Sequence, residues 1–341
     1  MTDTPKQSAP GRSLLPLWLL LAALPLLMWL ALVSGSFASG SADVLRVLSA
    51  RLSGIPDGST LDTVIWQLRL PRMLAAVLLG ASLASAGALY QGVLRNPLVS
   101  PDILGVSAGA GLGAVLAMLW GWPMAALQAS AFIGGLLAVL LVYLIGSRIA
   151  ARDPILVLVL AGIAVTTVLG AGISLVKIVA DPHEQLPGMT WWLLGGLNGV
   201  SLTDLQWAFP VVALALLPLW LLRWRINLLS LPDDEACALG LGVQRLRWLL
   251  IALATLLTAA VVAFAGVVGW VGLIIPHVAR FWVGPDFSRL LPVSLLLGAC
   301  FVLMTDLLAR SLASSEIPLG VLTALLGGPF LVLVLLRERR P

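Results

Sequence analysis

The sequence predicts an all-α membrane protein whose chain crosses the bilayer ten times. The first reason is a shortage of charge, because 11 % of the 341 residues are charged and 60 % are apolar, whereas soluble domains carry about 25 % charged residues. The second is a series of long uncharged stretches. The third is that these stretches are continuously apolar rather than alternating, which excludes transmembrane β-strands. The same composition excludes a soluble enzyme.

The uncharged stretches mark the spans in chain order, since a helix needs about 20 apolar residues to cross the hydrocarbon core. They are 14–33, 73–94, 103–147, 154–176, 205–222, 248–279, 290–305 and 317–336. The third is long enough for two spans, and Gly121-Trp122-Pro123 predicts a tight turn inside it. In the sixth, Gly266 and Gly269 predict a turn followed by a short helix. Ten spans are therefore expected.

The first span is expected to be a retained anchor. Lys6 and Arg12 precede it, and Ser36-Phe37-Ala38 behind it resembles a signal-peptide cleavage site. The apolar run between them is longer than the roughly 7–15 residues of a signal-peptide core. A membrane helix therefore explains this segment better than a cleaved signal does.

The basic residues give the orientation, because cytoplasmic loops are enriched in Lys and Arg. A cytoplasmic amino terminus places most of them inside. The exceptions, on the outer side, are Arg46, Arg51, Arg69, Arg72, Lys177 and Arg310. We expect both termini to be cytoplasmic, with 1–13 and 337–341 as short tails of one permease domain whose helical bundle spans 14–336.

Small residues recur at every fourth position in several spans. The stripes are Gly80, Ala84, Ala88, Gly92; Gly105, Gly109, Gly113, Ala117; Gly162, Thr166, Gly170, Ser174; and Gly320, Ala324, Gly328. Side chains at this spacing share one helix face, and small faces let helix backbones approach closely in lipid. The stripes predict a compact bundle and say nothing about cargo.

The longest internal loop spans 223–247. Its Ser230-Leu231-Pro232-Asp233 segment has the pattern of a helix start, with serine as the cap and acidic residues beside the positive helix end. Gly240 predicts the end of that helix. We expect this short helix and a second one from Val243 to lie flat on the membrane. The loop is either a solvated connection or a docking site for a cytoplasmic partner.

Side chains that could catalyse a reaction or couple transport to an ion are scarce in the predicted spans. Asp306 and Arg310 lie four residues apart and are expected to pair, either as a structural ion pair or at the surface. His277 and His183 lack a second ligand at helical spacing, so no metal site is predicted. The phosphate-binding pattern GxxxxGK[ST] is absent from the sequence. We therefore expect no catalytic residue and no cofactor in this chain, with ATP and magnesium bound by a partner ATPase.

A set of motifs then stands in a specific order along residues 60 to 336. They are Arg69-Leu70-Pro71-Arg72, Asn96-Pro97-Leu98, Leu104-Gly105-Val106-Ser107, Gly272-Leu273-Ile274-Ile275-Pro276-His277, Asp306-Leu307-Leu308-Ala309-Arg310 and Glu316-Ile317-Pro318-Leu319-Gly320. In this order they resemble the permease subunits of ABC importers for iron chelates, haem and vitamin B12 (FecCD type). The resemblance implies the ten-helix type II permease fold of the cobalamin permease, with an inverted repeat relating spans two to five and seven to ten.

The resemblance also implies partners and site residues. The partners are a second permease subunit (the same chain or a related one), two cytoplasmic ATPase subunits, a periplasmic binding protein and the lipid of the bacterial inner membrane; no nucleic acid is expected. The residues implied to dock the ATPase are Asp233, Asp234, Glu235, Leu239 and Gly240. Those implied to meet the binding protein are Arg69, Arg72 and Arg310. The implied cytoplasmic gate is Asn96, Pro97 and Leu98, with Ile155 and Leu156 where the cobalamin permease has small polar residues.

The expected function is ATP-driven import of an iron chelate, a ferric siderophore, by alternating access. The alternative cargoes are haem, cobalamin and an oxyanion. An ion-coupled secondary transporter would need ion-binding side chains at mid-membrane, and an intramembrane enzyme would need a paired His, Asp, Glu or Ser constellation. Neither pattern is visible in the predicted spans.

Overall fold

The computed structural model describes residues 15–35, 40–54, 58–149, 154–313 and 315–338, and the regular structure of these residues is helical. Lys6 and Arg12 before the first span, and Ser36-Phe37-Ala38 behind it, lie outside this described part. The tail expected at 1–13 lies outside it as well, and of the tail expected at 337–341 the first two residues belong to the last helix while 339–341 lie outside.

Ten apolar helices build the bundle in the described part of the chain. Seven meet both the length and the composition of a membrane-crossing helix, and three further apolar helices complete the set. They are α1 (Leu15–Val33), α4 (Leu70–Val93), α5 (Val106–Leu119), α6 (Met124–Arg148), α7 (Pro154–Val179), α9 (Leu202–Ile226), α11 (Val243–Ala265), α12 (Val271–Val283), α13 (Phe287–Ser311) and α14 (Leu319–Glu338). They coincide with the ten predicted spans, which confirms the all-α membrane fold.

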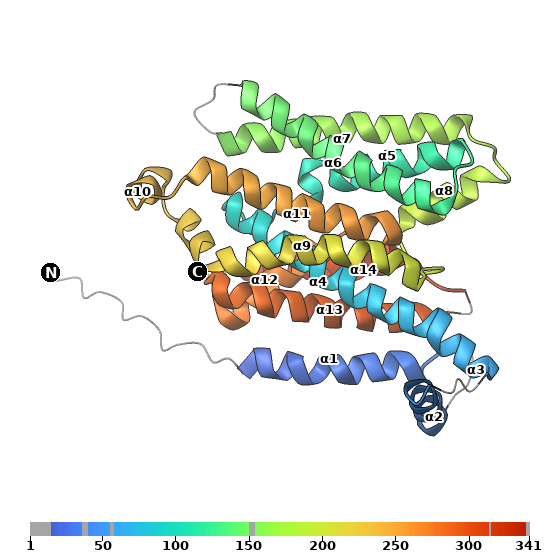
Figure 1. Ribbon diagram of the computed structural model, residues 1–341. Helices are drawn as coiled ribbons and strands as arrows, with labels where there is room; N and C mark the ends of the chain where they lie inside the picture. Colours follow the sequence, from blue (N-terminus) through green and yellow to red (C-terminus); the bar gives the residue numbers. More distant parts are fainter. Residues whose placement is uncertain (1–14, 36–39, 55–57, 150–153, 314, 339–341) are drawn as a thin grey trace.

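Short elements connect these helices at the two ends of the bundle. They are α2 (Ser41–Leu52), α3 (Thr60–Thr63), η1 (Val64–Arg69), η2 (Pro101–Leu104), α8 (Gln185–Leu194), η3 (Asn227–Ser230) and α10 (Asp233–Ala238). In Figure 1, α2, α3 and α8 lie at one end, which we call the α8 end, and α10 lies at the other, which we call the α10 end. The two ends carry different candidate sites.

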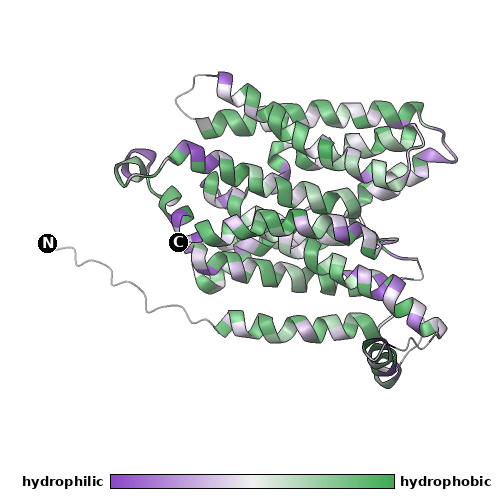
Figure 2. Ribbon diagram, in the orientation of Figure 1, coloured by the Kyte–Doolittle hydropathy of each residue, from purple (hydrophilic) through white to green (hydrophobic). Residues whose placement is uncertain are grey.

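The surface between the two ends suits a bilayer. Large apolar side chains such as those of Val168, Trp207 and Leu325 are exposed there. Figure 2 shows hydrophobic residues along the lengths of the helices and hydrophilic ones gathered toward both ends. This is the pattern of a chain whose outer face meets hydrocarbon.

Both predicted interruptions of long apolar stretches are confirmed. Helix α5 ends at Leu119 and α6 begins at Met124, so the turn falls on Gly121-Trp122-Pro123. Helix α11 ends at Ala265, and Gly266 has a φ of 67°. A β-carbon on Gly266 would also overlap the carbonyl oxygen of Trp192. Only glycine fits this left-handed, crowded position.

The second span is longer than its predicted range of 73–94. Helical structure is continuous from Thr60 to Val93, and η1 is a π-helical turn that ends directly before α4. Pro71 stands in the first turn of α4 and has no N–H to donate. The wider π-helical turn accommodates that missing hydrogen bond without ending the helix, so the Arg69–Arg72 motif is part of the helix.

The two predicted halves of the bundle share a pattern of helix lengths. The second helix of each half is short: α5 has 14 residues and α12 has 13. Each follows a residue with positive φ, Gly105 at 82° and Trp270 at 71°. Helices α4 and α11, which open the halves, run in opposite directions (Figure 1). This agrees with the inverted repeat expected of such permeases.

The small-residue stripes lie where helix backbones touch, but only in part. A β-carbon on Gly80 of α4 would overlap the carbonyl oxygen of Gly298 in α13, and one on Gly113 of α5 would overlap that of Ser130 in α6. In contrast, a β-carbon on Gly92 or Gly170 would have no atom within 4 Å. Close helix packing therefore explains the crowded members of each stripe and leaves the others open.

Two expectations for the loop 223–247 are wrong. Ser230 does not cap α10, because its hydroxyl donates to the carbonyl oxygen of Asn227 and closes the 3-10 turn η3. Pro232 holds the cap position instead. The expected second surface helix from Val243 is the beginning of the long helix α11. A helix does begin at Asp233, but the Ser230 hydroxyl is bonded within the preceding turn and does not cap it.

Candidate functional sites at the two ends of the bundle

The α10 segment presents an exposed surface at its end of the bundle. Asp234, Glu235 and Leu239 are exposed, and the side chain of Leu239 is 64 % accessible. Ala236 is fully buried and fixes the inner side of the turn. Gly240, with a φ of 81°, ends the segment. Acidic groups beside an exposed leucine form a surface that a protein partner could cover.

Asp233 differs from its neighbours because it is engaged within the chain. Both of its carboxylate oxygens accept hydrogen bonds of 3.1 Å from Arg247 of α11, and Arg95 also reaches one of them. Partial burial opposes the charge of this carboxylate, but the hydrogen bonds and charges of the two arginines outweigh it. The pKa of Asp233 therefore lies below its ordinary value.

The implied gate residues also lie at the α10 end. Asn96, Pro97 and Leu98 form an exposed turn after α4, and the Leu98 N–H donates to Oδ1 of Asn96 at 2.9 Å. Ile155 and Leu156 stand in the first turn of α7. Ile155 packs against the core, whereas the side chain of Leu156 is exposed. The structure thus places both candidate constrictions at one end of the bundle.

An ion cluster occupies the α8 end. Arg72 donates from Nε to Asp306 at 2.9 Å and from Nη1 to both carboxylate oxygens of Glu316 at 2.9 Å. Arg310 also pairs with Asp306, with 3.2 Å between Nε and Oδ2. The Asp306 side chain is 1 % exposed and that of Glu316 is 40 % exposed. The buried carboxylate holds both arginines in place, while the outer one is accessible.

Arg69 belongs to the same region but is held differently. Its guanidinium donates to the carbonyl oxygen of Leu32 at 2.7 Å and to that of Val33 at 3.2 Å, and the residue is 5 % exposed. A cavity of about 680 Å³ is lined by Arg69, Arg72, Arg310 and Glu316 among others. The structure therefore brings the three predicted arginines together around one cavity, each with partners inside the chain.

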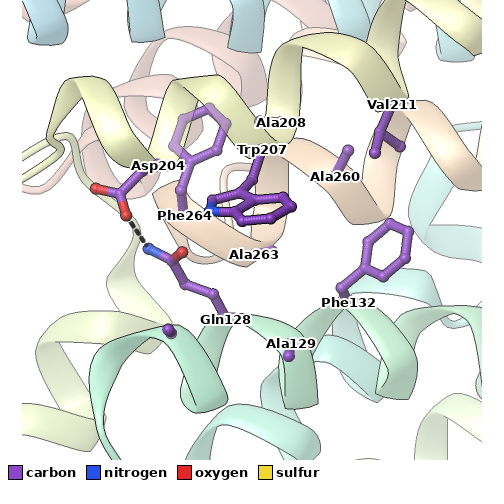
Figure 3. A pocket seen from close by; sticks show the side chains of 11 residues that line it. Gln128, Ala129, Phe132, Asp204, Trp207, Ala208, Val211, Ala260, Ala263 and Phe264 are labelled. Carbon is purple, nitrogen blue, oxygen red and sulfur yellow. Dashed lines mark hydrogen bonds between the residues drawn. The ribbon is translucent and has the colours of Figure 1, made fainter.

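A second cavity, of about 400 Å³, lies on the side of the bundle between α6, α9 and α11 (Figure 3). Gln128 donates to Asp204 at 2.9 Å at one edge of it. Most of the remaining lining is apolar, including Phe132, Trp207 and Phe264. Because its lining is mostly apolar, this cavity fits an apolar group better than a charged solute.

Sequence reasoning missed three members of these clusters. Glu316 was part of a motif but had no assigned role, and Arg95 and Arg247 were counted only as basic loop residues. Two of the three have partners far away in sequence: Glu316 is 244 residues from Arg72, and Arg95 is 138 residues from Asp233, whereas Arg247 is 14 residues from Asp233. The positive charge of Arg95 directly before the gate turn is the one local signal that could have identified it.

Known proteins are similar to this chain over most of its length. Residues 21–337 match the model of the FecCD transport family. The molybdate import permease MolB of Haemophilus influenzae is 38 % identical over 90 % of each chain. The cobalamin import permease BtuC of Halobacterium salinarum is 42 % identical over 84 % of this chain and 76 % of its own. A solved metal-chelate type ABC transporter in an inward-facing conformation matches with a TM-score of 0.85 and 36 % identity, over 94 % of this chain and 98 % of the other.

Proposed function

We propose, from the premise that this chain belongs to the FecCD transport family and is an ABC importer permease, that it carries a ferric siderophore from the periplasm to the cytoplasm. The observation that carries the importer mechanism is the presence of two different polar surfaces on opposite ends of one apolar bundle, while the proposed cargo is supported by relatives that are named for iron chelatin and Fe(3+) dicitrate. The α8 end has arginines around an open cavity, and the α10 end has an exposed acidic and apolar segment beside a turn. An importer that receives its cargo from one partner and its energy from another needs a docking surface at each end.

The α10 end is the proposed ATPase side. Asp234, Glu235 and Leu239 are exposed and close in sequence, as a docking segment requires. The sequence has no phosphate-binding loop, so the energy would come from two ATPase subunits that dock here. The gate turn of Asn96–Leu98 would then face the cytoplasm, and so would both termini.

The α8 end is the proposed docking site for a periplasmic binding protein. Arg72 and Arg310 line the cavity there and are held in place by the buried Asp306. Arginines whose side chains are already fixed lose little entropy when they bind a further carboxylate. Acidic groups on the binding protein are the proposed counterparts.

A second permease subunit would complete the translocation path. Helices α7 and α14 carry many exposed apolar side chains, such as those of Ile163 and Leu325. Pairing two copies, or two related chains, along these helices would cover that surface and enclose a path between them. The path would be alternately open to the two ends of the bundle.

The cargo is tested by uptake of radioactive iron. We expect a bacterial strain that lacks this permease to regain uptake of one or more ferric siderophores when the gene is returned. The panel should also contain haem, cobalamin and molybdate, because related permeases are named for molybdate and cobalamin. Restoration of one of these cargoes without any ferric siderophore would replace the proposed cargo and leave the importer class intact.

Glu316 is expected to compete with the binding protein for Arg72. It occupies Nη1 of Arg72 with both oxygens and is accessible, so an incoming carboxylate has to displace it. We expect Glu316→Gln to tighten capture of the binding protein roughly fivefold at low salt, a change of about 1 kcal/mol.

Reversing Arg69, Arg72 and Arg310 to Glu should weaken capture of the binding protein, and the loss of affinity should shrink as salt rises.

Surface plasmon resonance with the permease in nanodiscs measures this capture. Glu184→Gln is the matched control, because it removes an exposed acid from the same end of the bundle and should leave the affinity unchanged. An unchanged affinity in both Glu316→Gln and the triple reversal at low salt would remove the cluster from the docking surface.

A further inference from the structure

A single arginine ties the turn after α4 to the segment that leads into α10. Nε of Arg95 donates to the carbonyl oxygen of Leu229 at 2.8 Å, and Nη2 donates to that of Leu231 at 2.6 Å. Nη2 also pairs with Asp233 at 2.5 Å. One planar guanidinium therefore holds three acceptors spread over five consecutive positions of the η3–α10 segment.

The backbone of Arg95 has a conformation that is unfavourable for a residue with a side chain. Its φ is 49°, in the left-handed region where glycine is the usual residue at a helix end. The turn is otherwise an ordinary helix ending, because the N–H of Asn96 donates to the carbonyl oxygen of Gln91 at 3.1 Å. A glycine would form the same turn without strain, so the contacts of the arginine side chain account for its presence.

The turn is fixed on its other sides. The amide of Gln91 donates to the carbonyl oxygens of Leu273 at 3.1 Å and Val99 at 3.4 Å. Gln91 and Val99 are buried, whereas residues 95 to 98 are exposed. The exposed turn thus lies between two anchored positions, and Arg95 is the side chain that leads from it to the α10 segment.

The far side of Asp233 is held by α11. Arg247, whose side chain is 6 % exposed, donates to both carboxylate oxygens of Asp233. Asp233 thus lies between an arginine of the turn and an arginine of a long buried helix. Displacement of the α10 segment must either carry Arg95 with it or break a charged, multidentate contact.

We propose that Arg95 is a positioning residue that transmits movement of the α10 segment to the Asn96–Leu98 turn. This inference rests on the proposed function, in which α10 docks the ATPase and the turn gates the path. When ATP binding moves the α10 segment, the Arg95 side chain moves with it and pulls on its own backbone, which directly precedes Asn96. The gate turn then moves while Gln91 and Val99 stay anchored.

The test follows the turn with a spin label at Leu98, which is 44 % exposed. The label is placed on Leu98→Cys in a chain whose Cys237 is replaced by Ser and Cys300 by Ala, and the permease is reconstituted in nanodiscs with its ATPase. Mg-ATP is the probe, so no cargo is required. We expect Mg-ATP to change the mobility of the label in this background, and the change to fall at least fivefold with Arg95→Ala. ATP hydrolysis by the complex should stay within about twofold, because the docking surface of α10 is intact.

Two further variants separate transmission from folding. Arg95→Lys keeps one charge near Asp233 but cannot reach the two carbonyl oxygens at the same time, so it should fold and give a reduced label response. Arg245→Ala removes an exposed arginine at the start of α11 and should behave like the background. A full label response in Arg95→Ala overturns the inference. So does a parallel loss of ATPase binding and hydrolysis, which would mean that Arg95 only shapes the docking segment. A permease that does not bind the ATPase even with Arg95 present would instead contradict the proposed function.

Discussion

Replacing Glu235 with Arg and Leu239 with Asp is expected to abolish ATP-driven uptake while the protein stays folded in the membrane. Both side chains are exposed on the α10 segment, so the substitutions leave the bundle core untouched. They reverse one charge and place another where an apolar contact is proposed, which converts an attractive surface into a repulsive one. Like-charge contacts and an unpaired charge placed in an apolar contact together cost about 3 kcal/mol or more, so uptake should fall by at least a hundredfold.

The measurement pairs uptake with co-purification of the ATPase. The matched control is Glu235→Asp with Leu239→Met, which keeps the chemistry of both positions and should retain uptake. Unreduced uptake in the Arg and Asp variant would remove α10 from the docking surface. Uptake that continues with an inactivated ATPase and follows a proton or sodium gradient would instead favour an ion-coupled carrier.

Gly80→Ala is expected to destabilise the folded protein by about 1–3 kcal/mol, although it adds one methyl group. That methyl group would overlap the carbonyl oxygen of Gly298, and the next atoms met are also backbone atoms of α13. Backbone cannot rotate away as a side chain can, so the two helices have to separate. In lipid the energy of their association comes largely from such close packing.

Gly92→Ala is the matched control on the same helix, because its new β-carbon would have no atom within 4 Å. Alanine is the better helix former, so this variant should be as stable as the parent or slightly more stable. Thermal unfolding in detergent, followed by the remaining monodisperse fraction, compares the two. Equal midpoints for Gly80→Ala and Gly92→Ala would show that α4 and α13 can move apart without loss.

The spans could be predicted from the sequence because the bilayer imposes a length and a composition on each helix. The turn at Gly121-Trp122-Pro123 and the break at Gly266 were also predictable, since glycine and proline act locally. The 60–69 extension of the second span was not, because the spans were defined by uncharged stretches and Arg69 and Arg72 interrupt this one. The structure carries the helix through them with a π-helical turn.

The candidate sites were predicted as lists of residues, but their internal partners were not. The sequence indicated Arg72 and Asp233 as site residues. It gave no sign that Glu316 pairs with Arg72, or that Arg95 and Arg247 both pair with Asp233. Such pairs depend on which helices become neighbours, and that information is absent from local patterns. The same limit explains the error at Ser230, whose hydroxyl was engaged by the preceding turn.

Helix α4 joins features that have so far been described separately. Arg72 stands near its first residue and Arg95 two residues beyond its last, about 35 Å apart at 1.5 Å per residue. Between them, Gly80 and Gly87 press against the backbones of α13 and α12. Two neighbouring helices therefore hold α4 near its middle. While α4 stays intact and Gln91 stays anchored, the cluster around Arg72 and the turn after Arg95 keep a fixed separation, so movement at one end does not have to disturb the other.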